Sequence, residues 1–434
     1  MDISRTELIP GVALNYLYSD KFKTSCLSLT MLTQLSRQTA SLNALIPFVL
    51  RRGTAFHTDM EQISACLDNM YGAAIEPVVR RIGEIQCLGF FASIPEREFL
   101  PGNFDALSSC ASLMAEILLT PNTRGGLFLE QYVESEKENM IDMIRSRVND
   151  KTGYAVKRCI EEMCCFEDFS VSRYGAEEDC ENINYKKLSR HYKELLPKVP
   201  VEIFYCGREN EKRVSRILRD ALAAMPRGEI DYDIGTDVRM NAVNSEPRCV
   251  TEEMDVTQGK LVMGFRLGDV MEDPDPAALN VFNCVFGGGT TSKLFVNVRE
   301  RLQLCYYASS MLELHKGIML VHSGIEFDRL EDTKAEILAQ LDAMRRGEIT
   351  DEEMACARAC VASDLRSLTD SQGGMEGFYL ANILEGLDYG PMELAELVED
   401  VTKEQVVEIA SSVECDAVYF LRRWENEEDA EEIL

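Results

Sequence analysis

The segment FGGGTTSKLFVNVRERLQLCYYASS, residues 286–310, is the most informative stretch of the chain. It opens with three consecutive glycines, Gly287, Gly288 and Gly289, which free the backbone to adopt positive φ and let another chain approach closely. Apolar residues at helical spacing predict a helix over 291–302, and a strand-like run follows. The segment is not a phosphate-binding loop, because the lysine after the glycines lies at the wrong spacing.

Two hydrogen-bond donors stand at the end of this segment. Arg299 lies near the end of the expected helix, and Tyr306 opens the next strand seven residues later. A short turn could bring both side chains to one side, where they could hold a peptide carbonyl or stabilise a developing oxyanion. Alternatively, Arg299 pairs with a surface carboxylate and Tyr306 is a half-buried residue of the sheet. The residues alone favour this second interpretation.

Strand and helix signals alternate on both sides of the segment. Residues 73–82 and 84–94 indicate a hairpin turning at Gly83, while 201–206 and 260–268 are strand-like. Helical spacing or helix start signals mark 104–119, 213–225 and 331–346, with capping boxes expected at Thr58/Glu61, Thr350/Glu353 and Thr402/Gln405. Strands at hairpin spacing favour antiparallel sheets and an α+β fold over a parallel doubly wound one.

The two halves of the chain look alike. In the first half, an apolar helix ends in Arg52-Gly53-Thr54 and is followed by a helix over 59–70 and hairpin strands; in the second, ALNVFNCVF (278–286) precedes Gly289-Thr290. The pattern fades over 227–247, which we interpret as a linker. We therefore expect two homologous domains, 1–226 and 248–434, each an antiparallel sheet flanked by helices.

Composition narrows the classes of function. The formal charge of −29 argues against nucleic acid or an anionic membrane as the main partner, because affinity for polyanions comes from clustered Lys and Arg. The chain has neither a run of about 18 apolar residues nor a start typical of a signal peptide. Its 15 cysteines include no C-x-x-C pair, so we expect free, mostly buried thiols and a cytoplasmic location.

The 286–310 segment closely resembles the C-terminal-domain signature of the insulinase/pitrilysin (inverzincin) metallopeptidases, which places Arg-Glu-x-x-x-Leu-x-Tyr after glycines. Three further stretches resemble the family in the same order: LRRGTAFHTDMEQISACLDNMYGA (50–73), SRYGAEEDCENINYKKLSRHYKELL (172–196) and EITDEEMACARA (348–359). The resemblance implies a duplicated fold of the LuxS/metallohydrolase-like type, in agreement with the internal repeat.

One departure from the family decides the expected function. Active members carry His-x-x-Glu-His on the helix before the Gly-Thr, where two imidazoles bind zinc and the glutamate activates water. Alignment on Gly53-Thr54 places Ala44, Pro47 and Phe48 at these functional positions. A third, carboxylate ligand would fall near Asp142, which cannot hold zinc alone, and His57 lies beyond the turn. We expect no metal in this chain.

The resemblance implies a non-catalytic subunit. In the short-chain branch, as in mitochondrial processing peptidase and a bacterial pair linked to elongation factor P modification, one subunit carries zinc. A metal-free partner supplies arginine, tyrosine and a glycine-rich loop. We expect Arg299, Tyr306 and Gly287–Gly289 to act on an extended peptide in a heterodimer with such a zinc-bearing subunit. The alternatives are a scaffold or peptide-binding module without a role in proteolysis, and an enzyme that uses a cysteine.

Overall fold

The computed structural model describes residues 3–242 and 244–424 and divides into two compact units, each discontinuous in sequence. Unit 1 contains the described chain up to Arg145 together with Val171–Gly235 and Thr369–Gly390. Unit 2 contains Ser146–Ser170, Thr236–Leu368 and the described chain from Pro391. Each unit has one large sheet with helices packed against it, which confirms the expected α+β architecture.

The sheet of unit 1 has six strands in the order β1-β2-β8-β3-β5-β4. Its strands are β1 (Ser4–Ile9), β2 (Val12–Tyr18), β3 (Thr24–Gln34), β4 (Ala74–Ile82), β5 (Ile85–Pro95) and β8 (Val201–Gly207). The expected hairpin is present, because β4 and β5 pair antiparallel from Ile82 opposite Ile85. One pair, β2 with β8, is parallel, so the sheet is not antiparallel throughout.

The sheet of unit 2 repeats this arrangement with five strands in the order β11-β12-β10-β13-β9. Its strands are β9 (Arg248–Glu253), β10 (Gly259–Arg266), β11 (Cys305–Glu313), β12 (Ile318–Ile325) and β13 (Glu414–Arg422). Read from β9, the order matches β2-β8-β3-β5-β4 of unit 1, and β9 with β13 is again the parallel pair. The topology therefore supports the predicted duplication.

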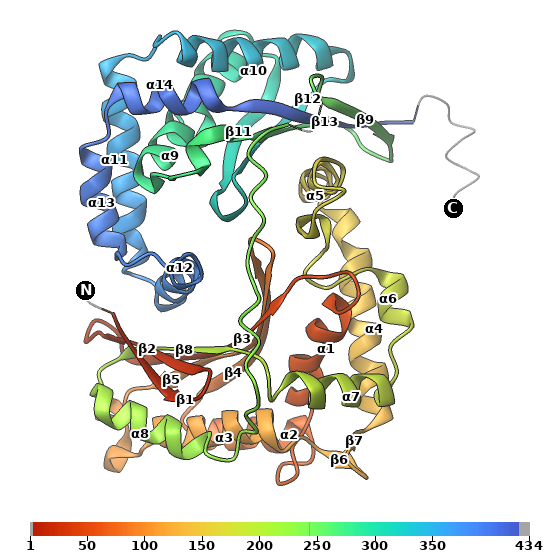
Figure 1. Ribbon diagram of the computed structural model, residues 1–434, viewed down its shortest axis with the longest axis vertical. Helices are drawn as coiled ribbons and strands as arrows, with labels where there is room; N and C mark the ends of the chain where they lie inside the picture. Colours follow the sequence, from red (N-terminus) through yellow and green to blue (C-terminus); the bar gives the residue numbers. More distant parts are fainter. Residues whose placement is uncertain (1–2, 243, 425–434) are drawn as a thin grey trace. The chain divides into compact units, whose positions relative to one another are not determined.

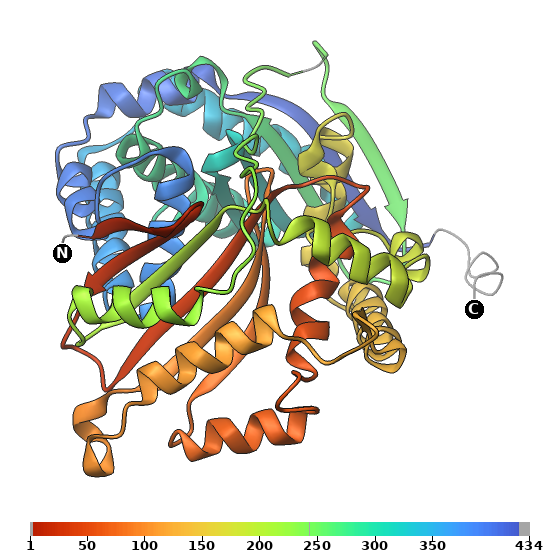
Figure 2. The ribbon, with the colours of Figure 1, turned by 60° about the horizontal axis from the view of Figure 1, so that its bottom comes forward.

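Helices cover both faces of the sheet in unit 1. On one face lie α1 (Ala40–Arg51), α3 (Ala106–Leu119) and α8 (Glu211–Ala221), whose apolar residues join those of the strands in one core; Figure 2 shows α3 in orange and α8 in yellow-green across the strands. On the other face lies α12 (Gln372–Glu385), where Tyr379 stacks on Phe204 with ring centroids 6.1 Å apart.

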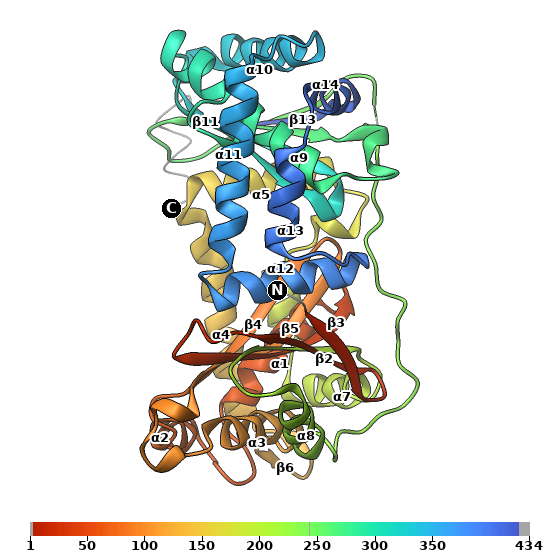
Figure 3. The same cartoon turned by 90° about the vertical axis from the view of Figure 1, so that its left-hand side faces the viewer.

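In unit 2, helix α5 (Lys151–Met163) packs against β10 and β13. The approach is close enough that a Cβ at Gly264 would lie 2.6 Å from the Met163 sulfur, so only glycine fits without rearrangement there. The other helices include α9 (Pro276–Asn283), α10 (Leu330–Arg345), α11 (Asp351–Leu368), α13 (Pro391–Glu399) and α14 (Lys403–Ser412). Helices α11 and α13 lie side by side (Figure 3).

The compact units do not follow the expected contiguous division into 1–226 and 248–434. Helix α5 comes before the linker but belongs to unit 2, and α12 comes after it but belongs to unit 1 (Figure 1). Each half of the chain thus contributes one helix to the sheet built mainly from the other half. The reason is complementary apolar packing, which no local sequence signal reveals.

The interior of unit 2 contains a cluster of charges from segments far apart in sequence. Arg266 on β10 is fully buried and pairs with Glu167 at 2.6 Å and with Asp416 at 2.8 Å. Lys316, also fully buried, pairs with Glu167 at 2.7 Å. Two cations and two carboxylates therefore neutralise one another, as buried charges require.

Two of the three predicted capping boxes are present. The capping boxes Thr350/Glu353 and Thr402/Gln405 are confirmed by reciprocal hydrogen bonds. The third was placed one residue early, since Asp59 rather than Thr58 caps helix α2 (Met60–Asn69). The remaining elements are α4 (Glu130–Ser146), α6 (Glu177–Glu181), α7 (Tyr185–Leu195), β6 (Thr123–Arg124) and β7 (Leu127–Phe128). In the described part of the chain, every helix is too short or too polar to cross a bilayer.

Candidate functional site

The glycine segment follows α9, which Asp275 caps by accepting hydrogen bonds from two backbone amides. The helix continues as a wider, π-type turn, η6 (Cys284–Gly288), before the chain turns at Gly289. A Cβ at Gly287 would lie 2.7 Å from the backbone nitrogen of Ser310 on β11, and Ser309 donates a hydrogen bond to the Gly287 carbonyl at 3.1 Å. Gly287 is therefore required where the turn touches the sheet.

The expected positive φ does not occur at Gly287, Gly288 or Gly289, whose φ angles lie outside the left-handed region. Close approach of backbone segments explains Gly287, whereas Gly288 is exposed and borders only Asn283. The left-handed residue of this region is Gln303, with φ of 52°. It forms the short turn that the sequence predicted between the helix and β11.

That turn connects η7 (Leu294–Arg301), a second π-type helical segment, to β11. Leu294 and Val298 are buried and hold η7 against the unit, while the Leu304 amide donates to the Val298 carbonyl at 3.0 Å. Arg299 and Tyr306 thus lie on either side of one tight connection. The predicted helix 291–302 is confirmed with a later start.

Arg299 is partly exposed, with 41% of its side chain accessible. Its guanidinium carbon lies 4.7 Å from the centroid of the Phe295 ring, and its Nε lies 3.5 Å from Glu300 Oε1. An exposed ion pair of this length contributes little stability, about 1 kcal/mol or less. Arg299 is therefore held loosely enough to turn toward another hydrogen-bond acceptor.

Tyr306 is 58% exposed at the start of β11, so it is not the half-buried sheet residue of the alternative interpretation. Its hydroxyl donates a hydrogen bond to Glu326. This hydrogen bond and the negative charge of Glu326 raise the pKa of Tyr306, so the phenol keeps its proton and remains a donor near neutral pH.

Glu300 and Glu326 were not identified from the sequence, although they contact the two predicted side chains. Glu326 is twenty residues from Tyr306 and comes next to it only because β11 and β12 pair. Glu300 is adjacent to Arg299 but carries no signal that separates it from any other surface carboxylate. If the pairing of β11 with β12 and its register had been predicted, Glu326 would have been recognised as a neighbour of Tyr306.

The positions aligned with the family's zinc motif lie inside unit 1. Ala44 is fully buried on α1, Pro47 is buried within the same helix, and Phe48 packs half-buried against the core. Proline also lacks the amide proton that an interior helical residue donates. These side chains offer no nitrogen, oxygen or sulfur ligand, so they do not fit a zinc site.

Other candidate ligands do not supply a metal site either. His57 Nδ1 lies 2.8 Å from Glu116, which also accepts a hydrogen bond from Thr54, so this histidine holds the turn after α1. Asp142 is exposed on α4. Among residues 3–242 and 244–424, no group of three or more His, Cys, Asp and Glu side chains could hold a metal ion.

All fifteen cysteines are free thiols, and most are buried or partly buried. Burial raises the pKa of Cys110 and Cys164 to about 12. A thiol must lose its proton to act as a nucleophile, so these two are unreactive near neutral pH. This burial gives no support to the alternative of a cysteine enzyme.

Comparisons with known proteins agree with the fold. The family profile of the peptidase M16 inactive domain matches residues 182–359. A protein of Bacillus subtilis (strain 168), described as "Probable inactive metalloprotease YmfF", is 30% identical over 414 residues, which span 95% of this chain and 96% of that protein.

Solved structures show the same architecture. A conserved protein from Enterococcus faecalis V583 superposes with a TM-score of 0.88 at 26% identity, over 98% of this chain and all of the other. A peptidase M16 inactive domain from Pseudomonas fluorescens superposes with a TM-score of 0.74 at 15% identity, over 98% of this chain and 99% of the other. The similarity therefore extends through both duplicated halves.

Proposed function

The chain belongs to the peptidase M16 family, and from this premise we propose that it is a zinc-free, non-catalytic subunit of a heterodimeric M16 metallopeptidase. The observation that carries the proposal is a contrast within the chain. Ala44, Pro47 and Phe48 occupy the positions of the zinc motif, whereas Arg299 and Tyr306 are exposed and would exchange their contacts with Glu300 and Glu326 for contacts with another molecule.

In this proposal Arg299 and Tyr306 act on a peptide held at the partner's zinc site. Both donate hydrogen bonds to the scissile carbonyl, and their donation strengthens as negative charge develops on that oxygen. Gly288 and Gly289 leave the backbone of the loop accessible, so an extended peptide can pass close to it. In this proposal the zinc ligands come from the partner, because residues 3–242 and 244–424 hold no group of side chains suited to a metal ion. The free thiols favour the cytoplasm as its compartment.

The test is to isolate the chain from its native organism together with bound proteins, and to measure metal content and peptidase activity of the chain alone and of the pair. We expect zinc and activity only when a zinc-bearing subunit is present. Zinc-dependent peptidase activity of the isolated chain would refute the proposal.

Substitutions then test the two side chains in the active pair. Arg299→Ala should lower kcat by about 100-fold, the typical effect of removing one oxyanion donor. Arg301→Ala is the matched control, since Arg301 is an exposed arginine on the same segment. Tyr306→Phe, compared with Tyr307→Phe, separates the exposed hydroxyl from the hydroxyl that contacts Thr152 at 3.1 Å. Unchanged kcat in Arg299→Ala and Tyr306→Phe would remove the role assigned to both residues.

The alternative, a peptide-binding scaffold without a role in proteolysis, has one specific observation in its favour. Arg299 and Tyr306 both contact carboxylates of this chain, Glu300 and Glu326, which a purely structural role would explain. Isolation of the chain without any M16 partner, together with full binding of peptides by Arg299→Ala, would favour this alternative.

A further inference from the structure

Unit 1 contains a cleft of about 350 Å³ that the proposed function does not use. It lies between the end of β3, the start of α1, the last turns of α7 and the first part of the linker, all within one compact unit. The volume is at the small end of the range for ligand sites, roughly 300–1,000 Å³. The cleft therefore suits a small ligand.

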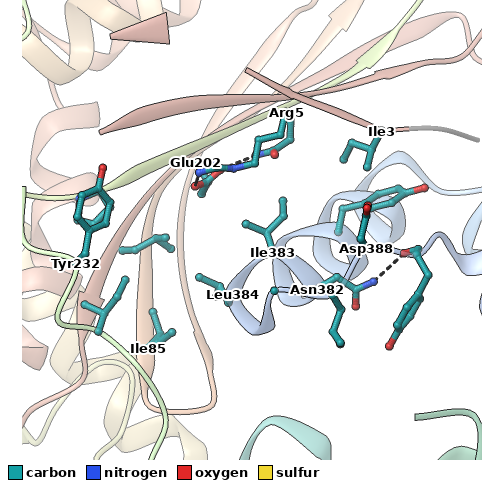
Figure 4. A pocket seen from close by; sticks show the side chains of 17 residues that line it. Ile3, Arg5, Ile85, Glu202, Tyr232, Asn382, Ile383, Leu384 and Asp388 are labelled. Carbon is teal, nitrogen blue, oxygen red and sulfur yellow. Dashed lines mark hydrogen bonds and ion pairs between the residues drawn. The ribbon is translucent and has the colours of Figure 1, made fainter. Parts of the chain in front are cut away.

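A larger cavity of about 660 Å³ adjoins this cleft and shares Leu32, Pro200 and Ile234 with it. The charged groups on its strands satisfy each other, since Arg5 donates to the Glu202 carboxylate at 2.7 Å (Figure 4). A polar group that is already paired gains little from a ligand. The smaller cleft differs because one of its polar atoms has no partner.

A chain of side-chain hydrogen bonds lies behind the polar wall of the cleft. Gln86 is fully buried, and its Nε2 donates to the carbonyl oxygens of Ala40 at 2.9 Å and Arg173 at 2.7 Å. Two carbonyl acceptors fix the Gln86 amide, so its Oε1 accepts from Asn43 Nδ2 at 2.9 Å. Asn43 Nδ2 also donates to Thr33 Oγ1 at 3.2 Å. The orientation of the buried Asn43 amide is therefore fixed as well.

This chain determines the tautomer of His191 on α7. Because Asn43 Nδ2 points toward Gln86, the amide oxygen Oδ1 faces His191 Nε2, at 2.6 Å. An amide oxygen can only accept a hydrogen bond, so Nε2 carries the proton of the neutral imidazole. The other ring nitrogen, Nδ1, then keeps its lone pair and is a hydrogen-bond acceptor.

The Nδ1 atom of His191 is open to a ligand. It has no hydrogen-bond partner in residues 3–242 and 244–424, it keeps accessible surface, and the side chain lines the cleft. Partial burial of the ring lowers the pKa of His191 below its ordinary 6.5, although the charge of Glu194 opposes this shift. The imidazole is therefore neutral near pH 7 and above, so Nδ1 stays an acceptor.

The rest of the wall favours a neutral and largely apolar ligand. Five apolar side chains line the cleft: Leu32, Leu195, Val199, Pro200 and Ile234. The charged lining residues, Glu194, Lys198 and Asp231, are all exposed, so water and salt screen them. A neutral hydroxyl satisfies Nδ1 without bringing a charge out of water. A phenol matches best, because its hydroxyl is more acidic than that of an alcohol and donates more strongly.

We propose that this cleft binds a phenol, with the ring among the apolar side chains and the hydroxyl donating a hydrogen bond to His191 Nδ1. The phenol can be a free small molecule or the side chain of a tyrosine in a peptide, because both present the same hydroxyl on the same ring. The inference is independent of the proposed peptidase role, since it uses neither Arg299 nor Tyr306.

The first test is nitrogen NMR of the isotope-labelled full chain at about pH 8, where histidine is neutral. Phenol is the probe, and toluene is the compound of equal shape without a donor. The chain has four histidines, and His191→Phe identifies the resonances of this one. We expect a protonated Nε2 and an unprotonated Nδ1, whose resonance phenol displaces and toluene does not. A protonated Nδ1, or an Nδ1 resonance that phenol leaves in place up to its solubility, would overturn the proposal.

Two variants measure the contribution of Nδ1 and locate the ligand. His191→Phe keeps a ring but removes the acceptor, so the affinity for phenol relative to toluene should fall by about fivefold to tenfold, the effect of one hydrogen bond. His315→Phe, in unit 2, should leave this ratio unchanged. Ile234→Trp should fill the cleft and abolish binding, whereas Leu397→Trp, at an exposed position of α13, should not.

Circular dichroism of each variant confirms its folding. An unchanged ratio of affinities in folded His191→Phe would refute the hydrogen bond to Nδ1. Unchanged affinity for phenol in folded Ile234→Trp would place the ligand elsewhere and refute the site.

A peptide arm distinguishes the two sources. The capped peptide Ala-Ala-Tyr-Ala-Ala should displace phenol if the natural ligand is a tyrosine side chain, because the peptide backbone then lies outside the cleft. If phenol binds but the peptide does not, the cleft is selective for a free phenol. Equal displacement by the peptide with phenylalanine in place of tyrosine would contradict the need for a hydroxyl group.

Discussion

Helices α1 and α9 occupy equivalent places in a duplicated frame, yet the regions around them are built differently. In unit 1, α1 is covered by apolar packing, and two of the three positions of the zinc motif, Ala44 and Pro47, are buried. In unit 2, α9 leads into glycines and then to exposed Arg299 and Tyr306, while the interior contains a neutral charge cluster. The comparison teaches that one strand topology can enclose an apolar helix in one unit and lead into a glycine turn with exposed polar side chains in the other.

The largest expected effect on stability comes from disrupting the buried charge cluster of unit 2. Glu167→Ala leaves Arg266 and Lys316 buried without their shared carboxylate, and removing one partner of a buried ion pair costs about 3–5 kcal/mol. Urea denaturation should show this loss in the free energy of unfolding. Glu300→Ala, which removes an exposed carboxylate, should cost less than about 1 kcal/mol. Equal effects of the two substitutions would contradict the importance of burial.

The second largest expected effect on stability comes from a substitution in the apolar core of unit 1. Ala44→His, the first step toward a zinc motif, places a large polar ring at a fully buried site. Overpacking and an unpaired polar group should together lower the free energy of unfolding by about 2–4 kcal/mol. Ala355→His, at an exposed position of α11, is the control and should change stability by less than about 0.5 kcal/mol. A stable Ala44→His protein would show that the helix can still accommodate a ligand.

A smaller effect separates the glycines of the loop. Gly287→Ala places a methyl group 2.7 Å from the Ser310 backbone nitrogen and should cost about 1–3 kcal/mol in thermal or urea unfolding. Gly288→Ala meets only Asn283, at 3.0 Å or more, and should be nearly neutral. A larger loss of stability in Gly288→Ala than in Gly287→Ala would mean that the exposed glycine, rather than the buried one, determines the conformation of the loop.

The charge cluster also predicts acid sensitivity. Burial alone would raise the pKa of Glu167, but hydrogen bonds from Arg266 and Lys316 outweigh it and hold the pKa below the usual range of a glutamate. A carboxyl whose native pKa is lowered stabilises the folded state above its unfolded pKa, and this stability disappears as pH falls through the native pKa. Stability should therefore decline below about pH 4.5 by up to roughly 1.4 kcal/mol per pH unit from this group. Urea unfolding of Glu167→Gln should lack this component of the slope.

The smallest expected effect is that of Arg299→Ala on stability, within about 0.5 kcal/mol, because the side chain is partly exposed and its ion pair is weak. Thermal unfolding of the isolated chain measures it. A loss of several kcal/mol would show that Arg299 is a structural residue, and would remove the basis for its role in the proposed peptidase.

Much of the frame could be predicted from sequence because its signals are local. Alternation around Gly83 predicted the β4–β5 hairpin, and Thr350 and Thr402 predicted helix starts that the hydrogen bonds confirm. The cap expected at Thr58 is formed by its neighbour Asp59, since either side chain can accept a hydrogen bond from a backbone amide of the first helical turn. Such competition between adjacent caps cannot be decided without the backbone angles.

The rest could not be predicted because it depends on contacts between distant residues. Glu167 and Arg266 are 99 residues apart, and nothing in either segment indicates the pairing. Resemblance to the family singled out Arg299 and Tyr306 but not Glu326. This glutamate contacts Tyr306 because the paired strands β11 and β12 bring the two residues together. Of the two reasons expected for Gly287, positive φ does not occur, and the segment that approaches closely, at Ser310, lies on another element.

The exchange of α5 and α12 has a consequence for biosynthesis. Unit 1 lacks one cover of its sheet until residues 369–390 have left the ribosome, so its apolar face around Phe204 stays open through most of translation. A fragment ending before the linker should aggregate, whereas two separately expressed halves should rescue each other's solubility. We therefore expect unit 1 to complete its folding only after residues 369–390 are synthesised, rather than as a first module finished before the second.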